Sequence, residues 1–346
     1  MIAIVATGKH IRSCRPPRGR TKCRRMKSRI ALVRTAAILL AAGSGLLAGL
    51  GLLGGYAMRL DAFAAFRWHA TALLVFAVLA AVWPRRALPL ALAAPPVIFG
   101  VPIIASLQTS MLSAMAARPT GGPASPPSSL RIMTFNTWDQ VRNIDEIHAL
   151  LRETKPDVAV LVEVSPPKRA LLEVLKPLYP YQVECAKRWP CSMALISRIP
   201  FEAQGTVMPH YQRPSTVWGR IAYGADALTI IGVHIHRPTR SPRIHWGHMR
   251  GLAEIVREAN GRVIVAGDFN MPVESAIYRA NWSGFTNAFS CAGWGFGATK
   301  ATGWHGIRID HVLLGPGWTC LGASVGPDLG LDHRPMMVDL SWQGTQ

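Results

Sequence analysis

Residues 263–270, Val-Ile-Val-Ala-Gly-Asp-Phe-Asn, limit the fold of this chain more than any other stretch. A run of strand-forming apolar residues stops at Gly267, and two polar residues, Asp268 and Asn270, follow two positions apart. If the extended conformation continues, both side chains project from the same face of the strand end. An ordinary Asx turn would also explain them. The alternative, which we favour in view of the other motifs below, is a buried strand whose polar end holds a hard cation or a phosphate oxygen.

Similar apolar runs recur along the second half of the chain, with helical patterns between them. Apolar residues at helical spacing predict helices over 144–151, 171–178 and 243–260, and Asn143 is expected to cap the first. No P-loop or Gly-rich dinucleotide turn follows a strand. The mixture predicts an α/β fold, a four-layer α/β sandwich of two packed mixed sheets flanked by helices. The predicted strands are 130–135, 158–164, 193–197, 216–222, 228–235, 263–266, 309–314 and 335–340.

The first third of the chain has a composition typical of membrane segments. Residues 35–55 carry no charge and are long enough to cross a hydrocarbon core of ~30 Å at ~1.5 Å per residue. The apolar runs at 68–83 and 87–107 are weaker, because the first is short and the second contains several prolines. We expect three transmembrane helices within 35–107. A re-entrant pair, or one broken span, in place of the last two is the alternative.

Charge is distributed unevenly and predicts the orientation in the membrane. Residues 1–128 hold 16 Lys/Arg and a single acid, Asp61, giving +15, whereas residues 129–346 hold 22 Lys/Arg and 18 Asp/Glu, giving +4. Most of the positive charge therefore belongs to the first part of the chain, and it does not indicate that the whole protein binds nucleic acid. The basic tail at 1–34 should stay in the cytoplasm. Three spans then put the remainder outside, in a multi-pass protein of the cell inner membrane. One span gives the same orientation, and two spans would leave the remainder inside.

A Pro/Gly/Ser-rich linker at 108–129 separates the membrane region from a folded domain at 130–346, which we call the C-terminal domain. Outside the cytoplasm its cysteines can form disulfides. Cys185 and Cys191 enclose a short loop and are the expected pair, and Cys291–Cys320 is a weaker prediction. Four free thiols are the alternative. Met26 is an alternative start of the chain, ahead of the first predicted span.

Polar residues gather at the ends of the predicted strands. Loops leave the packed core at these ends, so α/β active sites commonly form there. Each residue alone could be a turn former or a solvated strand edge, but so many amide, carboxylate and imidazole groups at equivalent positions favour a shared site. They are Asn136, Glu163, His234, Asp268, Asn270, Asp310, Asp332 and His333.

The segments around these residues, in this order, resemble the endonuclease/exonuclease/phosphatase superfamily. Its members include DNase I, the apurinic endonucleases, bacterial sphingomyelinases and inositol-polyphosphate phosphatases. The resemblance covers about residues 130–342, and Gly-Asp-Phe-Asn followed by Asp-His-Arg-Pro is its most specific part. The matching segments are 133–138, 160–164, 230–234, 267–270, 309–311 and 331–335.

The resemblance implies attack of water on a phosphoester, assisted by a divalent cation. The cation is expected to be Mg²⁺, with Mn²⁺ or Ca²⁺ as alternatives. Glu163 is the implied metal ligand, and Asp332 is a second candidate. Asp268 would orient or deprotonate the attacking water. Asn136 and Asn270 would donate to phosphate oxygens without adding charge.

The resemblance also implies roles for two histidines and one arginine. His333 would lie against the phosphate, held in its tautomer by Asp310. His234 would protonate the leaving group or stabilise charge. Arg198 matches a recurring family segment and is expected to border the phosphate, although an exposed turn residue is the ordinary interpretation.

Other histidines and aromatic residues have competing interpretations. His236, His245 and His248 lie near His234 in the sequence, but the surrounding acids and amides favour a harder cation than zinc. We expect these three histidines to be solvated or to line a substrate groove. Several aromatic residues could form a stacking surface or belong to the core: Trp282, Trp294, Phe296 and Trp304.

The sequence therefore predicts a membrane-anchored, divalent-metal-dependent phosphodiesterase of endonuclease-like type, with its C-terminal domain outside the cytoplasm. Its expected partners are the membrane and a phosphodiester substrate, either nucleic acid or a lipid headgroup. The alternatives are a sphingomyelinase-like lipid phosphodiesterase, a phosphatase, and a non-catalytic binding module tethered to the membrane.

Overall fold

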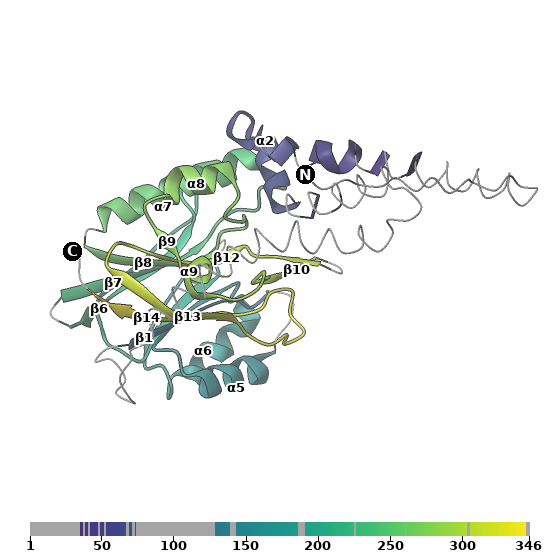
Figure 1. The fold of residues 1–346 in the computed structure, drawn as a ribbon. Helices are drawn as coiled ribbons and strands as arrows, with labels where there is room; N and C mark the ends of the chain where they lie inside the picture. Colours follow the sequence, from purple (N-terminus) through teal and green to yellow (C-terminus); the bar gives the residue numbers. More distant parts are fainter. Residues whose placement is uncertain are drawn as a thin grey trace, which may run out of the picture.

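The structure is a computed structural model that describes most of residues 129–343 and parts of 35–73, with gaps at 139–142, 186–190, 225, 260 and 303–304. Two six-stranded sheets form its centre (Figure 1). The first sheet has the strand order β13 (Trp318–Val325), β14 (Met336–Trp342), β1 (Ser129–Asn136), β2 (Val158–Val162), β4 (Met193–Ser197) and β3 (Tyr181–Glu184). The second has the order β5 (Phe201–Val207), β6 (Ser215–Tyr223), β7 (Asp226–His234), β8 (Arg262–Asp268), β12 (Asp310–Leu314) and β9 (Thr286–Asn287).

Both sheets are mixed. β1 runs parallel to β2, and β7 runs parallel to β8, whereas their other paired neighbours are antiparallel. The two parallel pairs lie at the centre of the sheets, and this explains their nearly continuous apolar sequences. A short hairpin of β10 (Lys300–Thr302) and β11 (His305–Ile307) lies outside both sheets.

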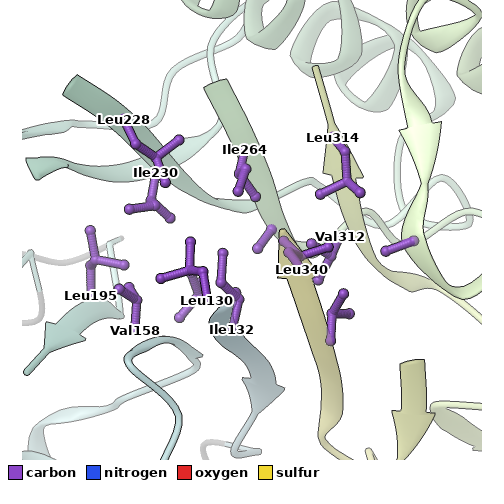
Figure 2. Packing of buried hydrophobic residues seen from close by; sticks show 14 of the residues in the cluster. Leu130, Ile132, Val158, Leu195, Leu228, Ile230, Ile264, Val312, Leu314 and Leu340 are labelled. Atoms are coloured by element: carbon purple, nitrogen blue, oxygen red, sulfur yellow. The ribbon is translucent and has the colours of Figure 1, made fainter. Parts of the chain in front are cut away.

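The main core fills the space between the two sheets. Figure 2 shows Leu130 and Ile132 of β1 packed with Ile230 of β7 and Ile264 of β8, and all four side chains are buried. Burying such a side chain contributes about 1.5–3 kcal/mol relative to exposure. The packing of apolar faces from both sheets therefore holds them together.

Helices cover the outer faces of both sheets (Figure 1). α5 (Ile144–Thr154) and α6 (Arg169–Leu175) pack their leucine and isoleucine faces on the first sheet, with η3 (Pro166–Lys168) before α6. α7 (Pro242–Glu258) and α8 (Ala276–Trp282) cover the second sheet, and α9 (Ala288–Ala292) lies against β13. The predicted α/β sandwich of two mixed sheets flanked by helices is confirmed.

Sequence patterns missed the edge strands and predicted one capping hydrogen bond that does not form. β3, β5, β9 and β13 are the outermost strands, and β5 alternates between partly buried and exposed side chains, so it lacks the apolar run of a central strand. Asn143 occupies the N-cap position of α5 as expected, but its side chain makes no capping hydrogen bond, and its amide donates to the carbonyl oxygen of Leu329 at 2.8 Å. The Cys185–Cys191 disulfide is confirmed, whereas Cys291 and Cys320 are free thiols that lie side by side.

The N-terminal part contains η1 (Leu53–Gly55), α2 (Met58–Asp61) and η2 (Ala62–Phe66). Within the described part of the chain, no helix is long and apolar enough to cross a membrane. The predicted tail at 1–34, the predicted span at 87–107 and the linker up to 128 lie outside the described residues, as does most of 68–83.

Candidate active site

The predicted polar residues meet at one edge of the double sheet. β1, β2, β7 and β8 end at this edge, with Asn136, Glu163, His234 and Asp268 at their ends. Strand register brings His234 opposite Asp268 across β7 and β8, and Asp310 opposite Asp268 across β8 and β12. His333 arrives from the loop just before β14, which runs antiparallel to β1. Residues far apart in the sequence thus converge because of the mixed topology.

The Gly-Asp-Phe-Asn turn is held in a conformation that its sequence explains. Gly267 has φ +150°, and a Cβ atom there would lie 2.0 Å from the carbonyl oxygen of Val233, so no other residue fits. Phe269 is buried, and its amide donates to the carbonyl oxygen of Ile309 at 2.9 Å. Asn270 adopts φ +51°, a strained value for a non-glycine residue. This backbone fixes the carboxylate of Asp268 in the site.

Asn136 connects the two carboxylates at the centre of the site. Its Nδ2 donates to Oε1 of Glu163 and to Oδ2 of Asp268, each at 3.0 Å. Its Oδ1 accepts from the backbone amide of Trp138 at 3.0 Å. All polar atoms of this buried amide are therefore used within the site. Glu163 has φ +59°, so the chain leaves β2 sharply at this carboxylate.

Asp310, His333 and Asp268 form a buried line of acid, imidazole and acid. Nδ1 of His333 lies 2.8 Å from Oδ2 of Asp310, and its Nε2 lies 3.8 Å from Oδ2 of Asp268. Exposed fractions are 0% for both carboxylates and 1% for His333. Within the described chain, Nε2 of His333 has no hydrogen-bond partner. The imidazole thus presents one nitrogen to the site while Asp310 holds the other.

Two further nitrogen-bearing side chains, those of His234 and Arg237, face the carboxylates. Nε2 of His234 lies 3.8 Å from Oε1 of Glu163 and 3.9 Å from Oδ2 of Asp268. Nη2 of Arg237 lies 3.7 Å from the same Glu163 oxygen, and its side chain is 37% exposed. Arg237 is therefore both near the site and accessible from solvent.

Burial and neighbouring charges shift two pKa values. Desolvation raises the pKa of Asp268, and the negative charge of Asp310 raises it further, against the opposing effect of His333. Desolvation by itself would lower the pKa of His333, but Asp310 and Asp268 outweigh it and raise the pKa to about 9. His333 is thus protonated at neutral pH. Perturbed, coupled carboxylates and imidazoles of this kind are common in catalytic sites.

The donor set fits a divalent cation. In each of two groups the possible ligand atoms lie within 4.8 Å of one another: Glu163, His234 and Asp268 form one group, and Asp268, Asp310 and His333 form the other. A protonated His333 cannot coordinate a cation, so the first group is the candidate metal site. Oδ1 of Asp310 is buried without a hydrogen-bond partner in the described residues. Carboxylate oxygens in this number suit a hard ion better than a thiol-preferring one.

Two predicted site residues have other partners in the structure. Arg198 follows β4, which is antiparallel to β2, and its Nη1 lies 3.9 Å from Asp157 at the beginning of β2. Glu163 lies six positions further along, or about 20 Å at ~3.3 Å per residue. Arg198 is therefore at the opposite edge of the sheet. Asp332 pairs with Lys300 and belongs to neither group of convergent ligand atoms that the described residues form.

The amide of Asn270 is also occupied. Its Nδ2 donates to the carbonyl oxygen of Ile235 at 2.9 Å and lies 3.3 Å from Oδ2 of Asp268. Its backbone amide donates to Oδ1 of Asp268 at 2.8 Å. Asn270 is next to the site as predicted, and in this structure it orients Asp268.

Two of the nearby histidines are not solvated, in contrast to one of the two interpretations given above. His245 and His248 are buried on α7, and each has a ring nitrogen within hydrogen-bond distance of a backbone carbonyl, that of His236 at 2.7 Å and that of His210 at 2.8 Å. They connect the helix to neighbouring loops. Trp282 belongs to the core, Trp294 and Phe296 are exposed, and Trp304 lies outside the described residues.

Sequence reasoning missed several residues that support the site. The amine of the buried Lys168 donates to the backbone carbonyls of Thr137 and Trp138, in the loop after Asn136. The hydroxyl of Thr299 accepts from the backbone amide of Asp310 at 3.1 Å. No motif marks these residues, and only the three-dimensional packing identifies them.

The family model described as "Endonuclease/Exonuclease/phosphatase family" matches residues 133–333, more than half of the chain. The chain therefore belongs to the endonuclease/exonuclease/phosphatase family, whose members are phosphoesterase hydrolases that depend on a divalent metal. The match spans the whole set of strand ends described above. No curated protein sequence matches this chain.

Solved structures share the fold at low sequence identity. A humanized TDP2 from D. rerio has a TM-score of 0.54 and 17% identity, and the match covers 62% of this chain and 99% of that chain. D. rerio TDP2 complexed with single-strand DNA product has a TM-score of 0.52 and 17% identity, covering 62% and 99%. A functionally unknown conserved protein from Enterococcus faecalis V583 has a TM-score of 0.54 and 15% identity, covering 62% and 100%. The likeness at these identities concerns the fold.

Proposed function

We propose that this chain is a membrane-anchored, Mg²⁺-dependent phosphodiesterase of endonuclease-like type, which cleaves its substrate by attack of water. The observation that carries the proposal is the buried line of Asp310, His333 and Asp268, in which Asp268 also faces Glu163 through the amide of Asn136. Burying several charged groups together costs folding free energy, so such a cluster favours a catalytic role over a structural one.

Glu163 would hold the divalent cation, with Asp268 and His234 beside it. When bound, the ion would neutralise negative charge on the phosphoryl oxygens and on the leaving oxygen. The amide of Asn136 keeps the two carboxylates together, because it donates to both. Mg²⁺ is the proposed ion, since it binds through one or two carboxylates plus substrate phosphate.

The protein residues provide the proton transfers. Asp268 is suited to orient the attacking water and to accept its proton, because a raised pKa makes the ionised carboxylate a stronger base. His333 is protonated at neutral pH, and its Nε2–H is available to donate to a phosphate oxygen. His234, which is partly exposed at the rim of the same carboxylates, is suited to protonate the leaving oxygen.

Nucleic acid is the proposed substrate class. Support comes from the fold shared with D. rerio TDP2, which was solved with single-strand DNA product. Arg237 beside Glu163 offers a cation to a backbone phosphate. Lipid phosphodiesters present the same phosphate chemistry to this site, so the substrate experiment below must separate the two sources.

The proposed location is the inner membrane, with the C-terminal domain outside the cytoplasm. The uncharged stretch at 35–55 and the basic tail before it support this orientation. The Cys185–Cys191 disulfide agrees with it, since structural disulfides persist in oxidising compartments.

A substrate screen with the detergent-purified full-length chain tests this function. The substrates are labelled single-stranded DNA, plasmid DNA, sphingomyelin vesicles and a phosphate monoester, each with Mg²⁺ or with EDTA. We expect Mg²⁺-dependent cleavage of DNA. Headgroup release from the vesicles without DNA cleavage would assign the lipid function, and monoester hydrolysis alone would assign a phosphatase. No hydrolysis of any substrate would leave only a binding module and contradict the proposal.

A further inference from the structure

The single acidic residue among positions 1–128 is buried against the C-terminal domain. Asp61, at the end of α2, is 1% exposed. Its Oδ2 accepts from the hydroxyl of Ser275 at 2.8 Å and from the backbone amide of Ile277 at 3.2 Å, and its Oδ1 accepts from the backbone amide of Ala276 at 2.7 Å. These groups form the N-terminal end of α8. A buried carboxylate with three donors is a specific contact.

The backbone around Asp61 is shaped for this contact. A Cβ atom at Gly54 would lie 2.5 Å from Oδ1 of Asp61, so a side chain there would displace the carboxylate. The neighbouring Gly55 approaches α8 directly, and its ideal Cβ position lies 3.8 Å from Cβ of Ala276. η1 contacts α8, and α2 contacts α7, as Figure 1 shows at the outer face of the second sheet. We call residues 53–66 the docking segment.

We infer that the docking segment is a fixed part of the C-terminal domain, and that both therefore lie on the same side of the membrane. The inference rests on the membrane anchoring proposed above. The docking segment begins within the last residues of the predicted span at 35–55, and the predicted runs at 68–83 and 87–107 separate it from the domain. Those two runs must then both cross the membrane or both fail to cross it. Together with the span at 35–55, the chain then has either three spans or one, and two spans are excluded.

The contact also fixes how the domain faces the membrane. Because the docking segment begins where the first predicted span ends, the α7–α8 face is held close to the membrane surface. α8 begins six positions after Asn270, so this attachment point is close in sequence to the Gly-Asp-Phe-Asn turn. The membrane anchor therefore holds the C-terminal domain through the α7–α8 layer behind the catalytic turn, in addition to the linker at 108–129.

An engineered disulfide tests the inference. The Cβ distance between Gly55 and Ala276 equals the usual disulfide value of about 3.8 Å, so the full-length double variant Gly55→Cys/Ala276→Cys should form a bond. A protease site inserted within 117–129 allows the two parts to be separated after oxidation of isolated membranes. We expect the parts to stay together on a non-reducing gel and to separate after reduction.

The matched control is Gly43→Cys/Ala276→Cys. A Cβ atom at Gly43 would have nothing within 4 Å, so this pair should not crosslink. Absence of the Gly55–Ala276 crosslink, or equal crosslinking in both pairs, would overturn the inference. Segments on opposite sides of a membrane cannot form this bond.

A further substitution keeps the test decisive if the cysteine pair folds poorly. In the Gly55→Cys/Ala276→Cys background, Gly54→Val should strongly reduce the crosslinked fraction, because the valine displaces Asp61. Gly43→Val should leave that fraction unchanged. An unchanged crosslink with Gly54→Val would contradict docking through Asp61. Failure of these tests leaves the hydrolysis assay unaffected, so the two proposals can be separated.

Discussion

Nδ1 of His333 lies 2.8 Å from Oδ2 of Asp310, and both side chains are buried from solvent. Strand β12 brings Asp310 opposite Asp268, so the pair is built into the register of the second sheet. Asp310 therefore determines the charge and orientation of the imidazole that faces Asp268. This relationship leads to the first prediction.

Asp310→Asn should lower kcat by at least about 100-fold with little loss of folding, because the amide neither stabilises an imidazolium nor fixes its tautomer. The measurement is hydrolysis of the substrate found in the screen, together with circular dichroism. Asp328→Asn is the control, since Asp328 is an exposed partner of Arg334. A wild-type rate in Asp310→Asn would contradict the role assigned to this carboxylate.

Asn136→Ala should destabilise the metal-free protein by about 1–3 kcal/mol, because the carboxylates of Glu163 and Asp268 lose their shared donor. Added Mg²⁺ should recover part of this free energy of unfolding by binding to Glu163 beside Asp268. Urea denaturation with and without Mg²⁺ measures both effects. Asn281→Ala, on α8, serves as the comparison. Equal stability of Asn136→Ala and wild type would show that the bridge is unimportant.

Arg237→Ala and Arg198→Ala should differ in their effect on substrate binding. Arg237 lies 3.7 Å from Glu163, so its loss should raise KM about tenfold, equivalent to ~1.4 kcal/mol. Arg198 pairs with Asp157 at the opposite sheet edge, so its loss should leave KM unchanged. Steady-state kinetics decide between the two residues. A larger increase in KM for Arg198→Ala than for Arg237→Ala would support the phosphate contact that the family resemblance implies for Arg198 and would contradict the observed placement.

Stability should fall in mild acid because of the buried histidines of α7. Burial lowers the pKa of His245 and His248 to about 4, from an ordinary value of 6.5. Between these pH values the unfolded chain binds more protons than the folded chain. The free energy of unfolding therefore decreases as pH falls, by at most ~1.4 kcal/mol per pH unit for each histidine. Above about pH 6.5 this contribution is fully present.

Urea denaturation between about pH 7 and pH 4.5 measures this dependence. His245→Gln should flatten the curve, because one group that binds a proton only on unfolding is removed. His148→Gln, on the outer helix α5, should not. A His245→Gln curve as steep as that of the wild type would assign the acid sensitivity to other groups.

The central fold was predictable because its strands are buried on both faces. β2, β7 and β8 read as apolar runs, and a polar residue of the site is the last residue of β7 and β8 and directly follows β2. β5 and β13 were not predicted, because edge strands carry mixed side chains and lack such runs. The α/β sandwich could therefore be inferred although its edge strands were not predicted.

The residue types of the site were predictable, but their connections were not. Motif order identified Asp268 and His333 as parts of one site. The sequence does not show that Asn136 donates to two carboxylates or that Arg237 faces Glu163. It also does not show strand direction, so Arg198 could not be assigned to a sheet edge before β4 was known to run antiparallel to β2.

Asp268 is the central residue of the proposed site, because its Oδ2 is close to Asn136, His234 and His333. Asp268→Asn in the full-length chain should retain the folded structure and reduce Mg²⁺-dependent phosphodiester hydrolysis by at least about 1,000-fold. The decisive measurement is the rate of phosphodiester cleavage by wild type and Asp268→Asn with Mg²⁺ and with EDTA. Loss of activity in the folded variant and in EDTA is the predicted result. Cleavage by Asp268→Asn at the wild-type rate would contradict the proposed site.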